Sequence, residues 1–252
     1  MPTLPWTVAE VTAAKAECTE ALKGVPLDYE PLDPIKEGLC GAPAPILVKS
    51  IGSDPKVVID PPATITCPLA HALGDWLDHI VQPEAKALLG GPVTGLHNAT
   101  SYACRNRYGA ADTPLSEHAL ANALDVSEFV LASGKRVTVL DAWPKVAAVP
   151  PLPVPNPVRP QSVTSSTASV STAKSAGHNA VEVTKAKVEA GPPPSPPPVA
   201  VEPASDPKTD FVRHVHDAAC RDFGTVLGPD ANEAHKNHFH LDMKGRRSSF
   251  CE

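Results

Sequence analysis

Apolar residues repeat at helical spacing in the stretch that follows Pro68. From Leu69 to Ile80 they return every three or four positions, which is the pattern of an amphipathic helix whose apolar stripe faces a core. Pro83 predicts a kink or restart in this helix, and Gly90 predicts its end.

Two further helices are predicted near the ends of the chain. Thr7 and Glu10 have the spacing of a capping box, which predicts a helix over 8–23. After Phe211 apolar residues again recur at helical spacing, and Gly224 predicts the end of that helix.

Short apolar runs predict the first strands. Short strands or extended connectors are expected at 46–48 and 57–59, and two strands are expected over 93–103.

The later strands are predicted from turn signals and alternation. Residues 124–131 and 135–141 flank a Ser-Gly pair, which is the pattern of a β-hairpin. From His238 to Met243 polar and apolar residues alternate. A strand there turns His238 and His240 to one face, about 7 Å apart along the chain.

Composition separates one segment from the rest. Fifteen of the 30 prolines lie between Pro144 and Asp210, together with a Ser/Thr/Ala-rich run and without any aromatic residue or cysteine. Such a segment cannot bury enough apolar surface to offset the entropy of ordering it. We therefore predict a disordered Pro/Ser/Thr/Ala-rich insert over 144–210.

The residues on both sides of the insert are predicted to form one domain. This α+β domain comprises 1–143 and 211–252, with a small antiparallel sheet and flanking helices. Two domains joined by a linker are the weaker alternative, because the C-terminal piece would rarely fold alone.

Charge and hydropathy exclude two classes of partner. The formal net charge is −6, and the only basic cluster is the short one at 244–247, so nucleic acid is not an expected partner. No apolar run reaches the roughly 18 to 20 residues of a membrane helix, and the first residues do not open a signal peptide.

The six cysteines are widely spaced and lie outside the insert. This placement predicts three disulfides and an oxidising compartment, although the sequence does not choose among the possible pairings. A zinc-thiolate site is not expected, because no close Cys pair is present. The cysteines are Cys18, Cys40, Cys67, Cys104, Cys220 and Cys251.

Two short motifs carry candidate chemistry. His235, His238 and His240 crowd into six residues, and a His-x-His pair on a strand commonly presents metal ligands. Most other histidines are expected to pack or to lie at the surface. The second motif contains Ser116, His118, Ala123 and Asp125, and it resembles the pattern of D-Ala-D-Ala metallopeptidases and penicillin-insensitive murein endopeptidases.

One position departs from that metallopeptidase pattern. Ala121 stands where those peptidases have glycine, so the backbone there has to adopt a conformation that alanine tolerates.

A closer resemblance covers nearly all of 35–143 and 211–252. Cys104-Arg105, the stretch from Leu115 to Ala119, Asn122-Ala123, the histidine cluster and the last cysteine are similar to the bacterial extensin-like C-terminal domain family. This resemblance implies one zinc ion held by His118, Asp125 and His240, with the fourth position left to water. Two neutral imidazoles and one carboxylate agree with a catalytic site, because they leave a Lewis-acidic ion with an open position.

The resemblance also implies roles for neighbouring residues. His238 would act as general base or stabilise an oxyanion, and His235 would support it or shuttle protons. Some relatives have a Glu base where this chain has Asn237, and Glu117 is a fallback.

Two more residues are candidates for substrate binding. Arg105 would bind a substrate carboxylate or polarise a carbonyl, or it is a surface residue beside a disulfide. Ser116 would bind substrate or cap the turn that carries His118.

The expected function is a periplasmic or cell-envelope zinc peptidase that cuts peptidoglycan stem peptides, as an endopeptidase in preference to a carboxypeptidase. The main alternative is a non-catalytic envelope-binding module with a structural zinc, and the insert could contact another envelope protein. A cytosolic zinc hydrolase with free thiols is a third possibility, which leaves the cysteine pattern unexplained.

Overall fold

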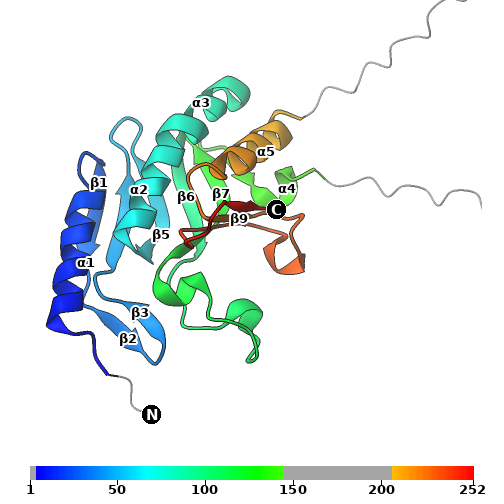
Figure 1. Cartoon of the computed structure of the whole chain (residues 1–252). Coiled ribbons are helices and arrows are strands. Elements are labelled where there is room, and N and C mark those ends of the chain that lie inside the picture. The colour runs from blue at the N-terminus through cyan, green and yellow to red at the C-terminus, as the bar shows by residue number, and fades with distance from the viewer. Residues whose placement is uncertain (1–3, 145–205) are drawn as a thin grey trace, which may run out of the picture. The chain divides into compact units, whose positions relative to one another are not determined.

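In the computed structural model, which describes residues 4–144 and 206–252, helices cover one face of a large mixed sheet (Figure 1). The strands are β1 (Leu27–Pro31), β2 (Ile35–Glu37), β3 (Cys40–Ala42), β4 (Ile46–Ile51), β5 (Val57–Ile65), β6 (Val93–Thr100), β7 (Ala123–Leu131), β8 (Arg136–Thr138), β9 (Thr225–Leu227), β10 (Phe239–Asp242) and β11 (Phe250–Cys251). The α-helices are α1 (Val8–Ala21), α2 (Cys67–Trp76), α3 (Gln82–Glu84), α4 (Val139–Ala142) and α5 (Pro207–Ala219).

The predicted α+β class is confirmed, but the prediction of a small antiparallel sheet is wrong. Across the described ranges nine strands join in the order β1-β4-β5-β6-β7-β10-β9-β11, with β8 paired to β7, and β2-β3 form a separate hairpin. β5 pairs with β6 in parallel, and β9 pairs with β11 in parallel. Strands as short as β9 and β11 carry too few residues for a period-two signal, which is why the sequence did not reveal them.

The predicted helices are present, with shifts at their ends. Thr7 and Glu10 form the expected capping box at the start of α1. Past α2 the helical run continues through η1 (Leu77–Val81), α3 and η2 (Ala85–Leu89), and left-handed Gly90 ends it. The flanking η1 and η2 are π-helical turns, which carry the run past Pro83 and its missing N–H.

Three strand and boundary predictions are revised. The stretch 93–103 holds one bulged strand, β6, instead of two. The hairpin is confirmed, but β8 ends at Thr138, whose side chain caps α4. α5 begins at Pro207, within the stretch assigned to the insert. The predicted disorder over 145–205, and the partner contact proposed for that segment, lie outside the described residues.

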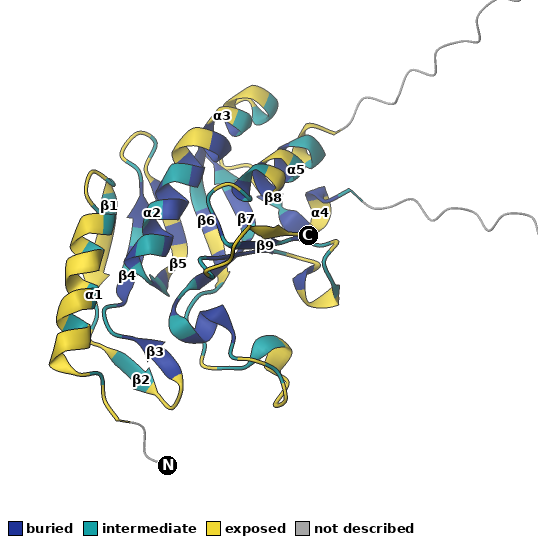
Figure 2. Cartoon of the chain, in the orientation of Figure 1, coloured by how far each residue is buried: buried dark blue, intermediate teal, exposed yellow. Residues whose placement is uncertain are grey.

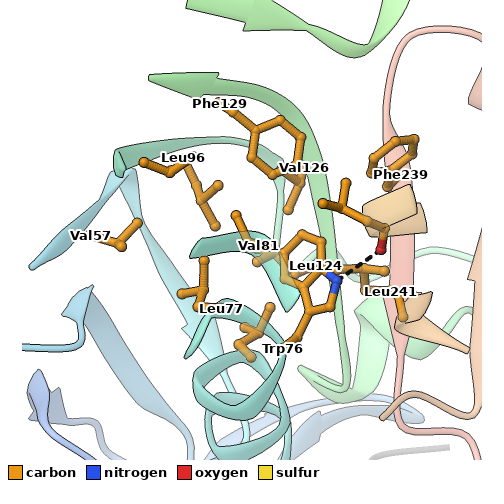
Figure 3. Packing of buried hydrophobic residues seen from close by; sticks show 14 of the residues in the cluster. Val57, Trp76, Leu77, Val81, Leu96, Leu124, Val126, Phe129, Phe239 and Leu241 are labelled. Carbon is orange, nitrogen blue, oxygen red and sulfur yellow. Dashed lines mark hydrogen bonds between the residues drawn. The ribbon is translucent and has the colours of Figure 1, made fainter. Parts of the chain in front are cut away.

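The core lies between the sheet and the helices α2 and α5. The ring of Phe129 on β7 lies 6.0 Å from that of Trp76 on α2 and 5.1 Å from that of Phe211 on α5. The Trp76 indole N–H donates to the Val215 carbonyl at 2.9 Å (Figure 3). Residues from before and after segment 145–205 therefore share one apolar core.

Alternation along β7 and β10 separates the core from the opposite face of the sheet. Phe239 and Leu241 point into the core (Figure 3). His240 and Asp242 therefore point to the other face, away from the helices. Asp125 on β7 lies directly opposite His240 in the strand register.

The burial of the helices differs along the chain (Figure 2). α2 is buried along much of its length, whereas α1 has no buried residue. No helix among the described residues is long and apolar enough to cross a membrane.

The prediction that all six cysteines form disulfides is confirmed. The bridges are Cys18–Cys67, Cys40–Cys104 and Cys220–Cys251.

Candidate metal centre

Three buried side chains from separate elements converge on the open face of the sheet. His118 lies on the 3-10 turn η4 (Glu117–Leu120), Asp125 on β7 and His240 on β10. Asp125 Oδ1 lies 3.1 Å from His118 Nε2 and 3.0 Å from His240 Nδ1, and these two nitrogens are 3.1 Å apart. This group could hold a metal ion.

The turn that carries His118 is held in place by its own backbone. The His118 carbonyl accepts from the Ala103 and Ala121 N–H groups at 3.2 and 3.1 Å. Ala121 then takes a left-handed conformation, φ 54° and ψ 25°, and leads the chain into β7. The backbone conformation that favours glycine is thus retained with alanine in place.

The outer ring nitrogens of both histidines face groups that only accept hydrogen bonds. His118 Nδ1 lies 2.6 Å from the Ser101 carbonyl oxygen, and His240 Nε2 lies 3.1 Å from Asp242 Oδ2. Each outer nitrogen therefore carries a proton, and each ring in its neutral form directs a lone pair inward. With the Asp125 carboxylate, three electron-pair donors meet at one point, which only a cation or an added proton satisfies.

Electrostatics at the centre agrees with that geometry. Burial disfavours the charged form of Asp125, but hydrogen bonds with His118 and His240 outweigh it and lower its pKa. Burial also opposes protonation of His240, whereas its hydrogen bonds with Asp125 and Asp242 raise its pKa to about 9. The site thus attracts positive charge to its centre.

His235 and His238 lie beside the three convergent side chains and favour the neutral form. Burial, followed by the charge on His240, lowers the pKa of His235 to about 4, and burial lowers the pKa of His238. His238 precedes β10 but still turns toward the site, because its Nε2 lies 3.6 Å from Asp125 Oδ2. His235 Nδ1 donates to Asn232 Oδ1 at 2.9 Å.

All seven residues proposed for metal binding, catalysis and substrate binding line one cleft of about 360 Å³. Arg105 and Ser116 are thus in the cleft with the histidines. Ser116 occupies the N-cap position of η4, but its side chain makes no capping hydrogen bond. The interpretation of Ser116 as a side-chain cap is therefore wrong.

Glu117 is part of an ion pair in the cleft wall. Its two carboxylate oxygens accept from Asn122 Nδ2 at 2.9 Å and from Lys244 Nζ at 3.0 Å.

Asp242, the hydrogen-bond partner of His240, was not among the predicted site residues. The period-two pattern placed Asp242 on the same face as His240, so the signal was present in the spacing. The Ser101 carbonyl, which faces His118, could not be predicted, because every residue type has a backbone carbonyl.

The comparison with known families covers this whole region. A family model described as Extensin-like protein C-terminus matches residues 16–150 and 162–252. No curated protein and no solved structure gives a significant match to the chain. Because the matched residues make up most of the chain and include every side chain of the cleft, the chain belongs to the extensin-like protein C-terminus family.

Proposed function

We propose that the chain is a zinc-dependent hydrolase that cleaves peptide bonds in peptidoglycan stem peptides or crosslinks, as an endopeptidase in preference to a carboxypeptidase. The observation that carries the proposal is the convergence of two inward imidazole lone pairs and one carboxylate, with both outer nitrogens already bonded. The peptidoglycan substrate comes from the resemblance to murein peptidases.

Zinc suits this donor set. His118, Asp125 and His240 would hold the ion, and three protein ligands are the number typical of catalytic zinc, whereas structural zinc has four. When bound, zinc supplies Lewis acidity that activates water and polarises a carbonyl. Ser101 and Asp242 would fix the two imidazole rings from behind, as outer partners of metal-bound histidines do.

His238 is the best placed proton carrier. Its Nδ1 donates to Asn237 Oδ1 at 2.8 Å, which leaves Nε2 as a proton acceptor at the site. In amide hydrolysis a C–O bond forms and the C–N bond breaks, while one proton moves from water to the leaving amine. His238 would carry that proton. His235, whose ring lies 5.3 Å from that of His238, would help to position it.

Glu117 is a weaker candidate for the base. Both of its oxygens already accept hydrogen bonds, one of them from the Lys244 ammonium. Either oxygen would have to give up one of these partners before it could accept a proton from water.

Arg105 and Ser116 would contact substrate. The guanidinium of Arg105 is a planar, permanently charged group that suits a carboxylate or a carbonyl. The Ser116 hydroxyl has no capping role and lines the cleft, which supports a substrate contact.

The state of the cysteines supports export to the cell envelope. All six form disulfides, and disulfides persist in oxidising compartments. The periplasm is therefore the proposed location.

Mass spectrometry of crosslinked muropeptides incubated with the protein tests this function. We expect products that vanish with chelator and return with zinc, and their masses identify the bond. His240→Ala is expected to lose both bound zinc and activity. His97→Gln is the matched control, because His97 lies exposed on β6 outside the cleft.

Two outcomes would contradict parts of the proposal. Full metal content and activity in His240→Ala would remove His240 from the ligand set. A zinc-loaded protein that gives no products would favour the non-catalytic binding module.

A further inference from the structure

The cleft around the metal centre presents guanidinium groups that have no acidic partner. Arg105, Arg107 and Arg246 all line it. Within 4–144 and 206–252 none of the three forms an ion pair, whereas ion pairs are present elsewhere on the surface. Uncompensated arginines in a concave site are a recurrent means of binding carboxylates.

The carboxylates of the same cleft are mostly committed to other groups. Asp125 and Asp242 bond the histidines, and Glu117 pairs with Lys244. Glu252 remains as an exposed acidic group on the wall. Three arginines therefore face one uncommitted carboxylate, which favours an anionic ligand.

Arg246 is held in a defined position. Its Nε donates to Thr225 Oγ1 at 3.1 Å, and its guanidinium lies 5.4 Å from the Phe250 ring centre. Thr225 is buried on β9 and pairs with Asp242 in the strand register. Among the described residues the guanidinium of Arg246 donates a hydrogen bond through Nε alone, so its two terminal nitrogens are available for a bidentate contact.

Arg105 and Arg246 are carried by elements on opposite sides of the two strands that hold Asp125 and His240. The sheet order is β6-β7-β10-β9, and the ligands Asp125 and His240 lie on the two middle strands. Arg105 belongs to the connection that leaves β6, whereas Arg246 is tied to β9. A ligand centred on the metal site can therefore reach one arginine at each end.

We propose that the cleft binds a peptide with a free carboxylate on each side of the scissile amide, and that Arg246 forms the second carboxylate site, opposite Arg105. This inference rests on the proposed function and names its substrate class. Arg246 is a specificity residue, since it would bind a part of the substrate that is distant from the reacting atoms.

Amidation tests the proposal, because it removes the charge of a carboxylate and nearly preserves its shape. Four versions of one crosslinked muropeptide are needed, with the carboxylates that flank the crosslinking amide free or amidated one at a time and together. Binding to the chelated, zinc-free full-length chain is measured by calorimetry, and hydrolysis is measured with zinc restored. Each amidation is expected to weaken binding about ten- to hundredfold, as the loss of a charged hydrogen bond predicts.

Variants then assign the two sides. Arg246→Gln should bind weakly and become insensitive to amidation on one side only, and Arg105→Gln should become insensitive on the other side only. Arg247→Gln is the matched control, because Arg247 is an exposed neighbour outside the cleft. It should keep the full response to both amidations.

Each failure has its own signature. Equal binding of the four muropeptides, no binding of any, or loss of the same side in both variants would overturn the two-carboxylate site. If the chain distinguishes the four muropeptides in binding as expected but the zinc-loaded chain hydrolyses none of them, the proposed peptidase activity is contradicted instead.

Discussion

Ala121 and Tyr108 both hold a backbone conformation that side chains disfavour. Tyr108 lines the cleft, and Ala121 follows the turn that carries His118. They are the two non-glycine residues with positive φ in the part of the chain that the structure describes, each at 54°. A left-handed L-residue costs about 1 to 2 kcal/mol. Ala121 adopts this conformation where the chain turns from η4 into β7. This turn lies between His118 and Asp125 in the sequence.

Replacing Ala121 with glycine should change stability little. The substitution removes the left-handed strain, and this offsets the loss of one buried methyl group, about 0.8 kcal/mol, and the added chain entropy. We expect the free energy of unfolding, measured in denaturant, to stay within about 0.5 kcal/mol of the wild type. Ala123→Gly is the control, since Ala123 is equally buried but lies in a regular strand. It should cost about 1 to 2 kcal/mol, and equal losses in both variants would argue against strain at Ala121.

Zinc affinity should rise with pH because of His240. Its pKa of about 9 in the metal-free protein means that the ring is largely protonated at neutral pH, and zinc must displace that proton. Lowering the pH below 9 strengthens the competing proton, so affinity should fall about tenfold per pH unit. Calorimetry at pH 7.5 in two buffers of different protonation enthalpy should show about one proton released per zinc.

Asp242→Asn provides the comparison for this pH effect. It replaces a charged acceptor beside His240 with a neutral amide oxygen and so weakens an interaction that raises the pKa of His240. Fewer protons should therefore be released at the same pH. A zinc affinity that stays constant from pH 6 to 9 would exclude the proton on His240 as the competitor.

At the scale of elements, α1 is joined to α2 by a disulfide and contacts the core only through partly buried residues such as Cys18 and Ala21. It has no buried residue, and Cys18 joins it to Cys67 at the start of α2. Just before the helix, the Trp6 indole N–H donates to the Ile35 carbonyl at 2.8 Å. Little apolar burial therefore opposes the detachment of α1.

The Cys18→Ala/Cys67→Ala variant should release α1 and leave the cleft intact. Hydrogen exchange is expected to show lost protection in 8–21 and retained protection in β7 and β10. The Cys220→Ala/Cys251→Ala variant is the counterpart, and it should instead expose β11, which that bridge holds against β9. Global loss of protection in the first variant would show that this bridge stabilises the whole core.

Elements with strong local signals could be predicted from the sequence. The capping box fixed the start of α1, and the apolar repeat after Pro68 located α2. The extent of the sheet could not be predicted, since β1 is mostly polar and exposed and β9 has three residues. Parallel pairing of β5 with β6 depends on the long helical connection between them, which a strand pattern does not encode.

The site was more predictable than the sheet around it. His118 and Asp125 belong to one short motif, and His240 to a cluster that alternates with apolar residues. Their meeting depends on β7 pairing with β10, across more than a hundred residues of chain. Contacts between residues far apart in the sequence, such as the ion pair of Lys244 with Glu117, can be identified only once the fold is known.

At the scale of the whole molecule, the candidate metal centre combines residues from both sides of segment 145–205. His118 and Asp125 precede it, whereas His240 follows it. The disulfides do not cross it, because two lie entirely before residue 145 and one lies entirely after residue 205. Only the backbone of 145–205 joins the two parts covalently.

A chain cut within 145–205 would therefore become two separate polypeptides without any reduction of disulfides. The fragments 1–144 and 206–252 would each lack a complete ligand set, and zinc would serve as a reversible cross-link between them. Size-exclusion chromatography of the mixed fragments should show a heterodimer that zinc stabilises and chelator weakens. His240→Ala in the shorter fragment should abolish the response to zinc, so complementation of the split chain would report the concentration of free metal.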